Sequence, residues 1–307
     1  MPAIWVPKRL VEVGLINTAA QSPETFISHC EIEYETRVLF AASESREANC
    51  KVIMLTGPSA SGKTTTAHKL AKALREAGTH TVVVSLDNFY RDIDDYPRLP
   101  DGTKDYENIT ALDVDEIHRC LRQLIETGEA DFPEFNFETE HRREERTHIA
   151  LEGGVVIVEG IHALNPILTN VLPAGSVYKI YAGLREEYSN GGQRFLPTRD
   201  IRLARRMVRD SKHRGHPLEK TIGMWAMVCA GEDRFIKAFK PEADLLLDTS
   251  FSYEISVLAP LVIELKGSLG GTPSGIVLDD LANRFLRCKP LAQTLVPAGS
   301  MLREFIG

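Results

Sequence analysis

The chain has 307 residues, of which 43% are hydrophobic and 26% charged, with a formal net charge of −7 at pH 7. This length and composition are typical of a globular protein with one large or two small domains. The acidic balance argues against nucleic acid as the main partner, and no apolar run is long enough to cross a bilayer. The five scattered cysteines and the lack of a recognisable secretory signal favour reduced thiols and a cytoplasmic location.

The first 50 residues are predicted to form an N-terminal helical extension. Ser22, Pro23 and Glu24 are typical of an N-cap, a first helical position and a first-turn acid. The helix that they start is expected to run to about Ala48.

From Lys51 to about residue 250, short apolar runs alternate with helical patterns. The expected strands cover residues 52–55, 81–86, 155–158, 177–181 and 245–247. Continuous apolar strands that are separated by helices predict a parallel sheet covered on both faces. Residues 51–250 would then form an α/β domain, and the purely helical pattern of residues 251–307 predicts a C-terminal helical subdomain.

The segment GPSASGKT, from Gly57 to Thr64, matches the phosphate-loop pattern GxxxxGK[ST]. An apolar strand precedes it and an amphipathic helix follows, as this motif requires. Backbone N–H groups would surround phosphate oxygens, Lys63 would reach the β- and γ-phosphates, and the Thr64 hydroxyl could ligate Mg²⁺. The predicted nucleotide contacts in this loop are Gly57, Ser59, Ala60, Ser61, Gly62, Lys63, Thr64 and Thr65.

The rest of the sequence narrows the class of nucleotide-binding protein. It contains no guanine-reading NKxD stretch and no LSGGQ-like signature, which excludes a regulatory GTPase and an ABC ATPase. Small-molecule kinases and a few ATP-dependent ligases remain.

Two acidic residues follow predicted strands directly, Asp87 and Glu159. Ligands of open parallel sheets lie beyond the carboxyl ends of the strands, where both carboxylates are expected. Phosphoryl transfer needs a carboxylate for the metal and its waters, and another to orient the acceptor hydroxyl. A helix- or turn-capping role is the alternative for each. His162, close to Glu159, is predicted to be structural.

Arg202, Arg205, Arg206 and Arg209 recur at helical spacing, and Arg214 follows them. One reading of this stripe is a solvated charged face with acidic partners nearby. The other is a lid that brings arginines onto the transferring phosphoryl group.

These motifs, in this order, resemble the uridine kinase and phosphoribulokinase family of P-loop kinases. The matching stretches are GPSASGKTT at 57–65, SLDNFY at 85–90, FPEFNFETEHR at 132–142, VVIVEGIHALNP at 155–166 and RLARRMVRDSKHRG at 202–215. The resemblance is closest to the kinase half of bacterial uridine kinase-like proteins with a TGS domain, whose C-terminal portion is similar to SMLREFIG at 300–307. It implies a P-loop NTPase fold with a mostly parallel five-stranded sheet of order 2-3-1-4-5.

The resemblance also implies roles for individual residues. Asp87 would be the catalytic base and Glu159 would assist the metal. Arg209 and Arg214 would contact ATP phosphates, and Arg206 would reach the acceptor side.

The acceptor pocket departs from the uridine kinase pattern. The ribose-binding Asp of the family falls at Glu107, the pyrimidine-packing Tyr at Phe135, and the base-reading His at Glu140, with His141 one place later. The predicted substrate-binding residues are Asp87, Tyr90, Glu107, Phe135, His141 and Arg206.

The sequence therefore predicts an ATP- and Mg²⁺-dependent kinase of a small-molecule hydroxyl, with a nucleoside 5′-hydroxyl as the leading acceptor. A sugar, a sugar phosphate or another polyol is the first alternative, and a catalytically inactive nucleotide-binding module is the second. Neither a nucleic acid nor a membrane is an expected partner, and homo-oligomerisation is left open.

Overall fold

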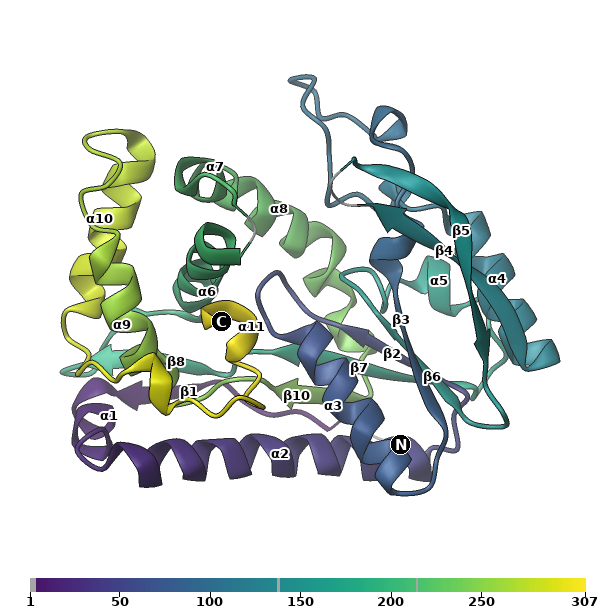
Figure 1. Cartoon of the computed structure of the whole chain (residues 1–307), viewed down its shortest axis with the longest axis horizontal. Helices are drawn as coiled ribbons and strands as arrows, with labels where there is room; N and C mark the ends of the chain where they lie inside the picture. Colours follow the sequence, from purple (N-terminus) through teal and green to yellow (C-terminus); the bar gives the residue numbers. More distant parts are fainter. Residues whose placement is uncertain (1–3, 137–138, 214) are drawn as a thin grey trace.

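The computed structural model describes residues 4–136, 139–213 and 215–307, and a five-stranded parallel sheet forms its centre (Figure 1). The strands, in spatial order, are β3 (Thr81–Ser85), β6 (Val155–Glu159), β2 (Val52–Thr56), β7 (Val177–Gly183) and β10 (Leu245–Asp248). Every neighbouring pair is parallel. Numbered along the chain, this order is 2-3-1-4-5, so the predicted P-loop NTPase topology is confirmed.

Two hydrophobic cores lie on the two faces of this sheet, because alternate strand residues point to opposite sides. In β2, Ile53 and Leu55 belong to the larger core, whereas Val52 and Met54 belong to the other. The larger core is covered by α2 (Pro23–Glu47), α3 (Lys63–Glu76), α6 (Thr198–His213), α7 (Leu218–Gly223), α9 (Glu254–Glu264), α10 (Pro273–Phe285) and α11 (Arg303–Ile306). The second core is covered by α4 (Val114–Thr127), α5 (Pro166–Thr169), the hairpin β4 (Glu129–Asn136)–β5 (His141–Ala150) and the end of α8 (Trp225–Phe235).

A second, three-stranded sheet corrects the prediction that the first 50 residues are only helical. The long helix α2 is present as predicted, but β1 (Arg9–Glu12) precedes it, followed by α1 (Val13–Ala19). β1 pairs in parallel with β8 (Glu186–Asn190), which forms a hairpin with β9 (Gln193–Leu196). The hairpin adds two strands between β7 and β10 that are not among the strands expected from the sequence. Division into domains at residues 50 and 250 stays a prediction.

No helix among the described residues is long and apolar enough to cross a membrane.

Candidate active site

The phosphate loop joins β2 to α3 and has the backbone that its glycines were predicted to allow. Gly62 caps α3 with φ +83°, and Ala60 also has a positive φ, 57°. A Cβ atom on Gly57 would lie 2.2 Å from the carbonyl oxygen of Ala182, so only glycine fits there. The loop is therefore held against the sheet, and the N-terminus of α3 presents free N–H groups to an anion.

Glu159 connects the loop to the sheet. Its Oε1 accepts hydrogen bonds from Ser85 Oγ at 2.9 Å and from Thr64 Oγ1 at 3.3 Å, while its Oε2 is buried without a partner in the part of the chain that is described. Burial raises the pKa of Glu159, and the positive charge of Lys63 opposes that rise. A buried carboxylate oxygen without a donor, beside an exposed threonine hydroxyl, is suited to a hydrated cation.

Asp87 lies one strand away from Glu159, as the resemblance implied. Ser85, at the end of β3, is the register partner of Glu159, and Asp87 stands in the turn that follows. The backbone N–H of Asp87 donates to Ser85 Oγ at 3.3 Å, and its own carboxylate has no hydrogen bond among the described residues. Its negative charge contributes, after burial, to raising the pKa values of Glu159 and Glu107.

The arginine stripe of α6 faces the phosphate loop. Arg202 is 2% exposed and forms two hydrogen bonds with Glu232, at 2.6 and 2.8 Å. The two partners bind both backbone groups of one loop residue: Arg202 donates to the carbonyl oxygen of Ser59 at 2.8 Å, and the N–H of Ser59 donates to Glu232 at 2.9 Å. The role of Glu232 could not be predicted from its local sequence, because its partner lies on another helix.

The next two arginines of the stripe reach the same loop. Arg205 is fully buried and donates to the carbonyl oxygen of Ala60 at 3.3 Å. Arg206 donates to Ser59 Oγ at 3.1 Å and lies 3.4 Å from Asp210. A solvated charged face is therefore the wrong reading of this stripe, since its arginines support the phosphate loop.

Arg209 was predicted to contact ATP phosphates, and it is 8% exposed and bound to Asp210 at 2.8 Å. That carboxylate also accepts from Thr221 at 3.2 Å. Contact with phosphate would require Arg209 to leave this pair. Arg214, the other predicted lid contact, lies outside the described residues.

Four aromatic rings gather beside Asp87. Tyr90 stacks on Tyr96 with ring centroids 5.6 Å apart, and it contacts Phe135 at 5.8 Å. Tyr106 meets Tyr96 edge-on at 5.4 Å. Tyr90 and Phe135 were predicted substrate contacts, whereas Tyr96 and Tyr106 were missed because no spacing rule connects them.

Glu107 and His162 meet on the other side of this space. Burial and the nearby Glu232 raise the pKa of Glu107 to about 7, against the opposing charges of Arg206 and Lys63. The ring of His162 is 1% exposed, faces the Glu107 backbone, and has no hydrogen bond at either nitrogen among the described residues. Burial lowers the pKa of His162 to about 4, so the ring is neutral at pH 7.

His141 does not join this group. It opens β5, is half-exposed, and lies 3.4 Å from Asp92.

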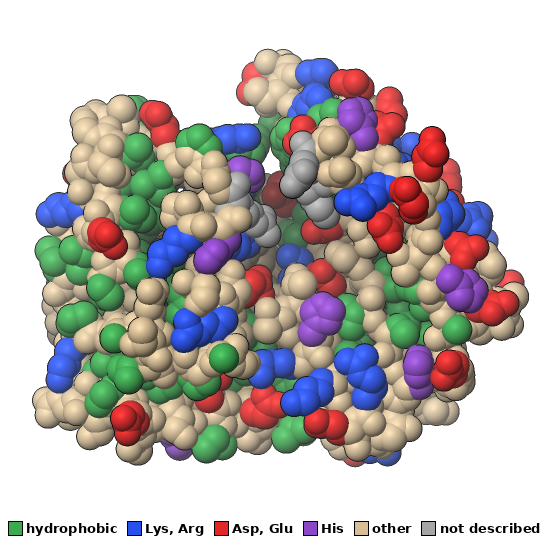
Figure 2. All heavy atoms as spheres, viewed as in Figure 1, with side chains coloured by type: hydrophobic (Ala, Val, Ile, Leu, Met, Phe, Trp, Pro, Cys, Tyr) green, Lys and Arg blue, Asp and Glu red, His purple; other side chains and the backbone are tan. Residues whose placement is uncertain are grey.

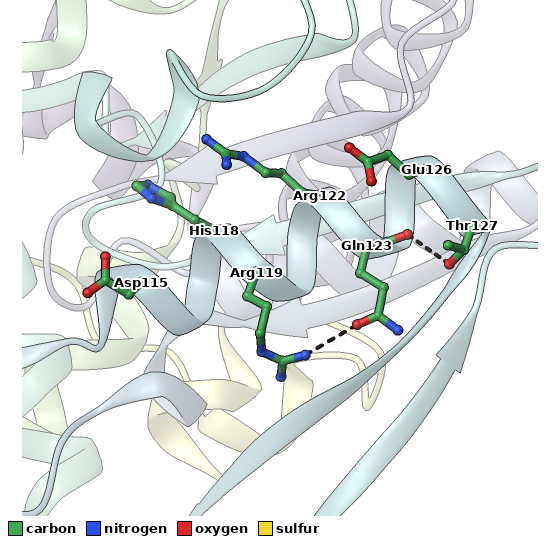
Figure 3. A pocket seen from close by; sticks show the side chains of 7 residues that line it. All are labelled: Asp115, His118, Arg119, Arg122, Gln123, Glu126 and Thr127. Atoms are coloured by element: carbon green, nitrogen blue, oxygen red, sulfur yellow. Dashed lines mark hydrogen bonds between the residues drawn. The ribbon is translucent and has the colours of Figure 1, made fainter.

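The surface of the molecule is hollowed between two of its parts (Figure 2). Figure 2 shows a notch between the part of the molecule that contains α6–α8 and the part that contains β4–β5, with acidic and basic side chains visible inside it. A shallow hollow elsewhere is lined by seven side chains of α4 alone, from Asp115 to Thr127, which project outward from one helix (Figure 3). None of the candidate site residues lines that hollow, so it is the solvated face of a helix.

Comparisons with known proteins identify the family of the chain. Residues 52–170 match the family model described as the Phosphoribulokinase / Uridine kinase family. The chain is 32% identical to a uridine kinase of Borrelia turicatae over 200 residues, which are 64% of this chain and 85% of that protein. It is 27% identical to a uridine kinase of Lactobacillus johnsonii over 207 residues, or 67% of this chain and 90% of that protein.

Among solved structures, a possible uridine kinase from Bacillus stearothermophilus has a TM-score of 0.49 and 19% identity, covering 70% of this chain and 100% of that one. This likeness is too distant to carry an argument. The 32% sequence identity with the Borrelia protein, over 85% of its length, is sufficient to assign the family. The chain belongs to the phosphoribulokinase and uridine kinase family.

Proposed function

We propose that this kinase transfers the γ-phosphoryl group of ATP to a hydroxyl group of a small molecule, with a nucleoside 5′-hydroxyl as the leading acceptor. The observation that carries the proposal is the position of Asp87, a carboxylate without a hydrogen-bond partner among the described residues, in the turn that follows the strand paired with the strand of Glu159. A phosphate loop alone would support nucleotide binding, but transfer to a hydroxyl needs a group of this kind beside it.

The donor side fits ATP and Mg²⁺. Ser61 Oγ and Glu159 Oε2 are buried without partners among the described residues, and the helix N-terminus at Gly62 is aimed at the same place. Thr64 would ligate the metal directly and Glu159 partly through water, since no group of three or more His, Cys, Asp or Glu residues in the described chain could hold it alone. The bound ion would neutralise charge on the transferring phosphoryl group.

Lys63, Arg206 and Asp87 would have separate roles in the transfer. Lys63 holds the β- and γ-phosphates, and Arg206, which already contacts Ser59, is placed to stabilise charge between donor and acceptor. Asp87 orients the acceptor hydroxyl and accepts its proton as the new oxygen–phosphorus bond forms.

The acceptor side combines a carboxylate with aromatic rings. Glu107 could accept hydrogen bonds from two hydroxyl groups, and Tyr90 and Phe135 could pack on a flat base. This combination supports a nucleoside.

One observation favours the alternative acceptor, a sugar, sugar phosphate or other polyol. Tyr96 stacks on the ring of Tyr90, and Phe135 contacts that ring too, so the aromatic side chains already cover one another. A hydroxyl-rich molecule would need Glu107 and Asp87 without needing a free ring face.

Release of ADP over a panel of nucleosides, sugars, sugar phosphates and polyols separates these possibilities. A nucleoside that raises ADP release by at least about 10²-fold over the acceptor-free rate, lost by a similar factor in Lys63→Ala, would support the leading proposal. A polyol as sole effective acceptor would establish the alternative. Binding of ADP or ATP with no acceptor-dependent release of ADP would indicate an inactive nucleotide-binding module.

A cytoplasmic location is also part of the proposal, and it is supported by five cysteines that are all free and buried.

A further inference from the structure

The C-terminal turn contacts the phosphate loop directly. Figure 1 shows α11 beside α6 and α3, and two contacts join the C-terminal turn to the start of α3. Thr65 Oγ1, in the first turn of α3, donates to Glu304 Oε2 at 2.6 Å. Met301 covers Gly62 so closely that a Cβ atom there would lie 2.3 Å from its sulfur.

The turn is fixed in this position by the rest of the fold. The Phe305 ring lies under the guanidinium of Arg205, 4.9 Å from ring centroid to Cζ. Ser300 Oγ donates to Glu31 of α2 at 2.6 Å, and Leu302 and Phe305 are fully buried. The contacts at the loop are therefore made by an ordered part of the larger core.

The first turn of α3 is held on a second side by α2. The hydroxyl groups of Tyr34 and Thr66 are 2.7 Å apart and buried. Thr65 and Thr66 are adjacent, so the N-terminal extension and the C-terminal turn hold neighbouring residues of one helical turn. Both segments lie outside the residues that match the family model, which are 52–170.

We propose that residues 300–307 contribute to nucleotide binding, and that Glu304 is a positioning residue that acts through Thr65. The carboxylate fixes the Thr65 side chain and, with Met301 above Gly62, holds the start of α3 where its N–H groups meet the phosphates. The inference rests on the donor nucleotide of the proposed function and is independent of the acceptor.

Two effects of Glu304 on nucleotide affinity have opposite signs. Its negative charge repels a polyphosphate, but Glu304 is partly exposed to solvent, where screening limits that repulsion to a few-fold in the binding constant. A hydrogen bond from a hydroxyl to a carboxylate shifts the equilibrium between the ordered and the disordered first turn of α3 by about tenfold or more, and without it the nucleotide would have to order that turn on binding. Positioning should therefore outweigh repulsion, and removing the carboxylate should weaken binding.

Calorimetric titration of the full chain with Mg·ADP, without any acceptor, tests this. Glu304→Leu, which has no acceptor for the Thr65 hydroxyl, and Thr65→Val are each expected to weaken ADP binding about tenfold, and the double variant little more than either one, because the two act through one contact. Thr65→Ser keeps the hydroxyl and should bind ADP within about twofold of the unmodified chain. Glu47→Leu is the matched control, since Glu47 accepts from Ser43 at 3.5 Å on the exposed face of α2.

The outcomes separate the claims. Tighter ADP binding by Glu304→Leu would mean that repulsion dominates, and this overturns the proposal. Unchanged binding, or strictly additive effects of the two substitutions, would mean that Glu304 does not act through Thr65, and this overturns it too. A lower stability in urea with unchanged ADP affinity would reduce the turn to a structural role and also overturn it. If the unmodified chain does not bind ADP at all, the proposed ATP donor is wrong and the proposed function fails. This result is distinguishable from a failure of the Glu304 proposal, because that failure is seen only by comparing variants with an unmodified chain that binds ADP.

Discussion

Arg205 and Glu254 form an ion pair that is closed to solvent, with Arg205 Nε donating to Glu254 Oε2 at 2.7 Å and both side chains 0% exposed. The same guanidinium donates to the carbonyl oxygens of Ala60 and Thr249. One side chain of α6 thus joins the phosphate loop, the end of β10 and the start of α9. Burial raises the pKa of Glu254 while Arg205 lowers it, so the charged state of the carboxylate depends on its partner.

Removing one member of this pair should be costly. Arg205→Met would leave a buried carboxylate facing an apolar side chain, for an expected loss of about 3–5 kcal/mol in the free energy of unfolding. Adding Glu254→Leu should recover most of the loss, because neither charge then remains buried. Urea denaturation of the three proteins measures both steps. A loss below about 1 kcal/mol for Arg205→Met would contradict the view that the pair supports the loop.

Glu159→Gln is expected to weaken the activation by Mg²⁺ while it raises the melting temperature of the ligand-free protein. The amide keeps an oxygen for Ser85 and Thr64 but loses the charge that a cation needs, so half-maximal activity should require at least about tenfold more Mg²⁺. The ligand-free protein should melt about 1–3 °C higher, because a buried carboxylate with one unpartnered oxygen is replaced by a neutral group. Activity over a Mg²⁺ series and a thermal melt without nucleotide check the two parts. An unchanged Mg²⁺ requirement would remove Glu159 from the metal site.

Acceptor binding should depend on pH through Glu107. Its pKa is raised to about 7, chiefly by burial, so the carboxylate is largely protonated below that value and ionised above it. The ionised form accepts hydrogen bonds from two hydroxyl groups, and the KM for the acceptor should therefore fall as pH rises from about 6 to 8. Steady-state kinetics at saturating ATP measure this, with Glu107→Gln as the comparison. The same pH profile in both proteins would show that another group titrates.

The sheet and the phosphate loop could be predicted because their signals are local. Each central strand is a short apolar run, and β2 is buried along its whole length. The hairpin β4–β5 gave no such signal: β5 has the sequence HRREERTHIA and is mostly exposed. β8 is charged and yet buried, since Glu186 and Glu187 pair with Arg9 and Lys8 from the start of the chain. Only the folded structure brings those partners together.

The same distinction applies to the candidate site. Asp87 and Glu159 could be predicted from their places after strands, and the register of β3 with β6 brings them together. Glu232 and Glu304 could not, because their partners Ser59 and Thr65 are more than 170 positions away in sequence. Nothing in the local sequence of Glu232 marks it as buried, and the resemblance of residues 300–307 to the family indicated no role for Glu304.

The strongest test of the proposed chemistry is Asp87→Asn, which keeps the size of the side chain and removes its charge. A turn-capping role, the alternative for Asp87, is weakened because Ser85 Oγ accepts the turn N–H and the Asp87 carboxylate has no hydrogen bond in the described chain. If Asp87 did act as a cap, Asn would serve almost as well and activity would change little. As the group that accepts the proton of the acceptor hydroxyl, Asp87 should matter only in the transition state. The substitution should then leave ATP affinity within about threefold while lowering kcat by at least about 10²-fold.

The charge of Asp87 also contributes to raising the pKa of Glu107, so Asp87→Asn should move the pH dependence of the acceptor KM to lower pH. Calorimetric ATP binding, together with steady-state kinetics over that pH range, measures all three effects. Near-normal kcat would remove Asp87 from the reaction and would leave the proposed transfer without a base.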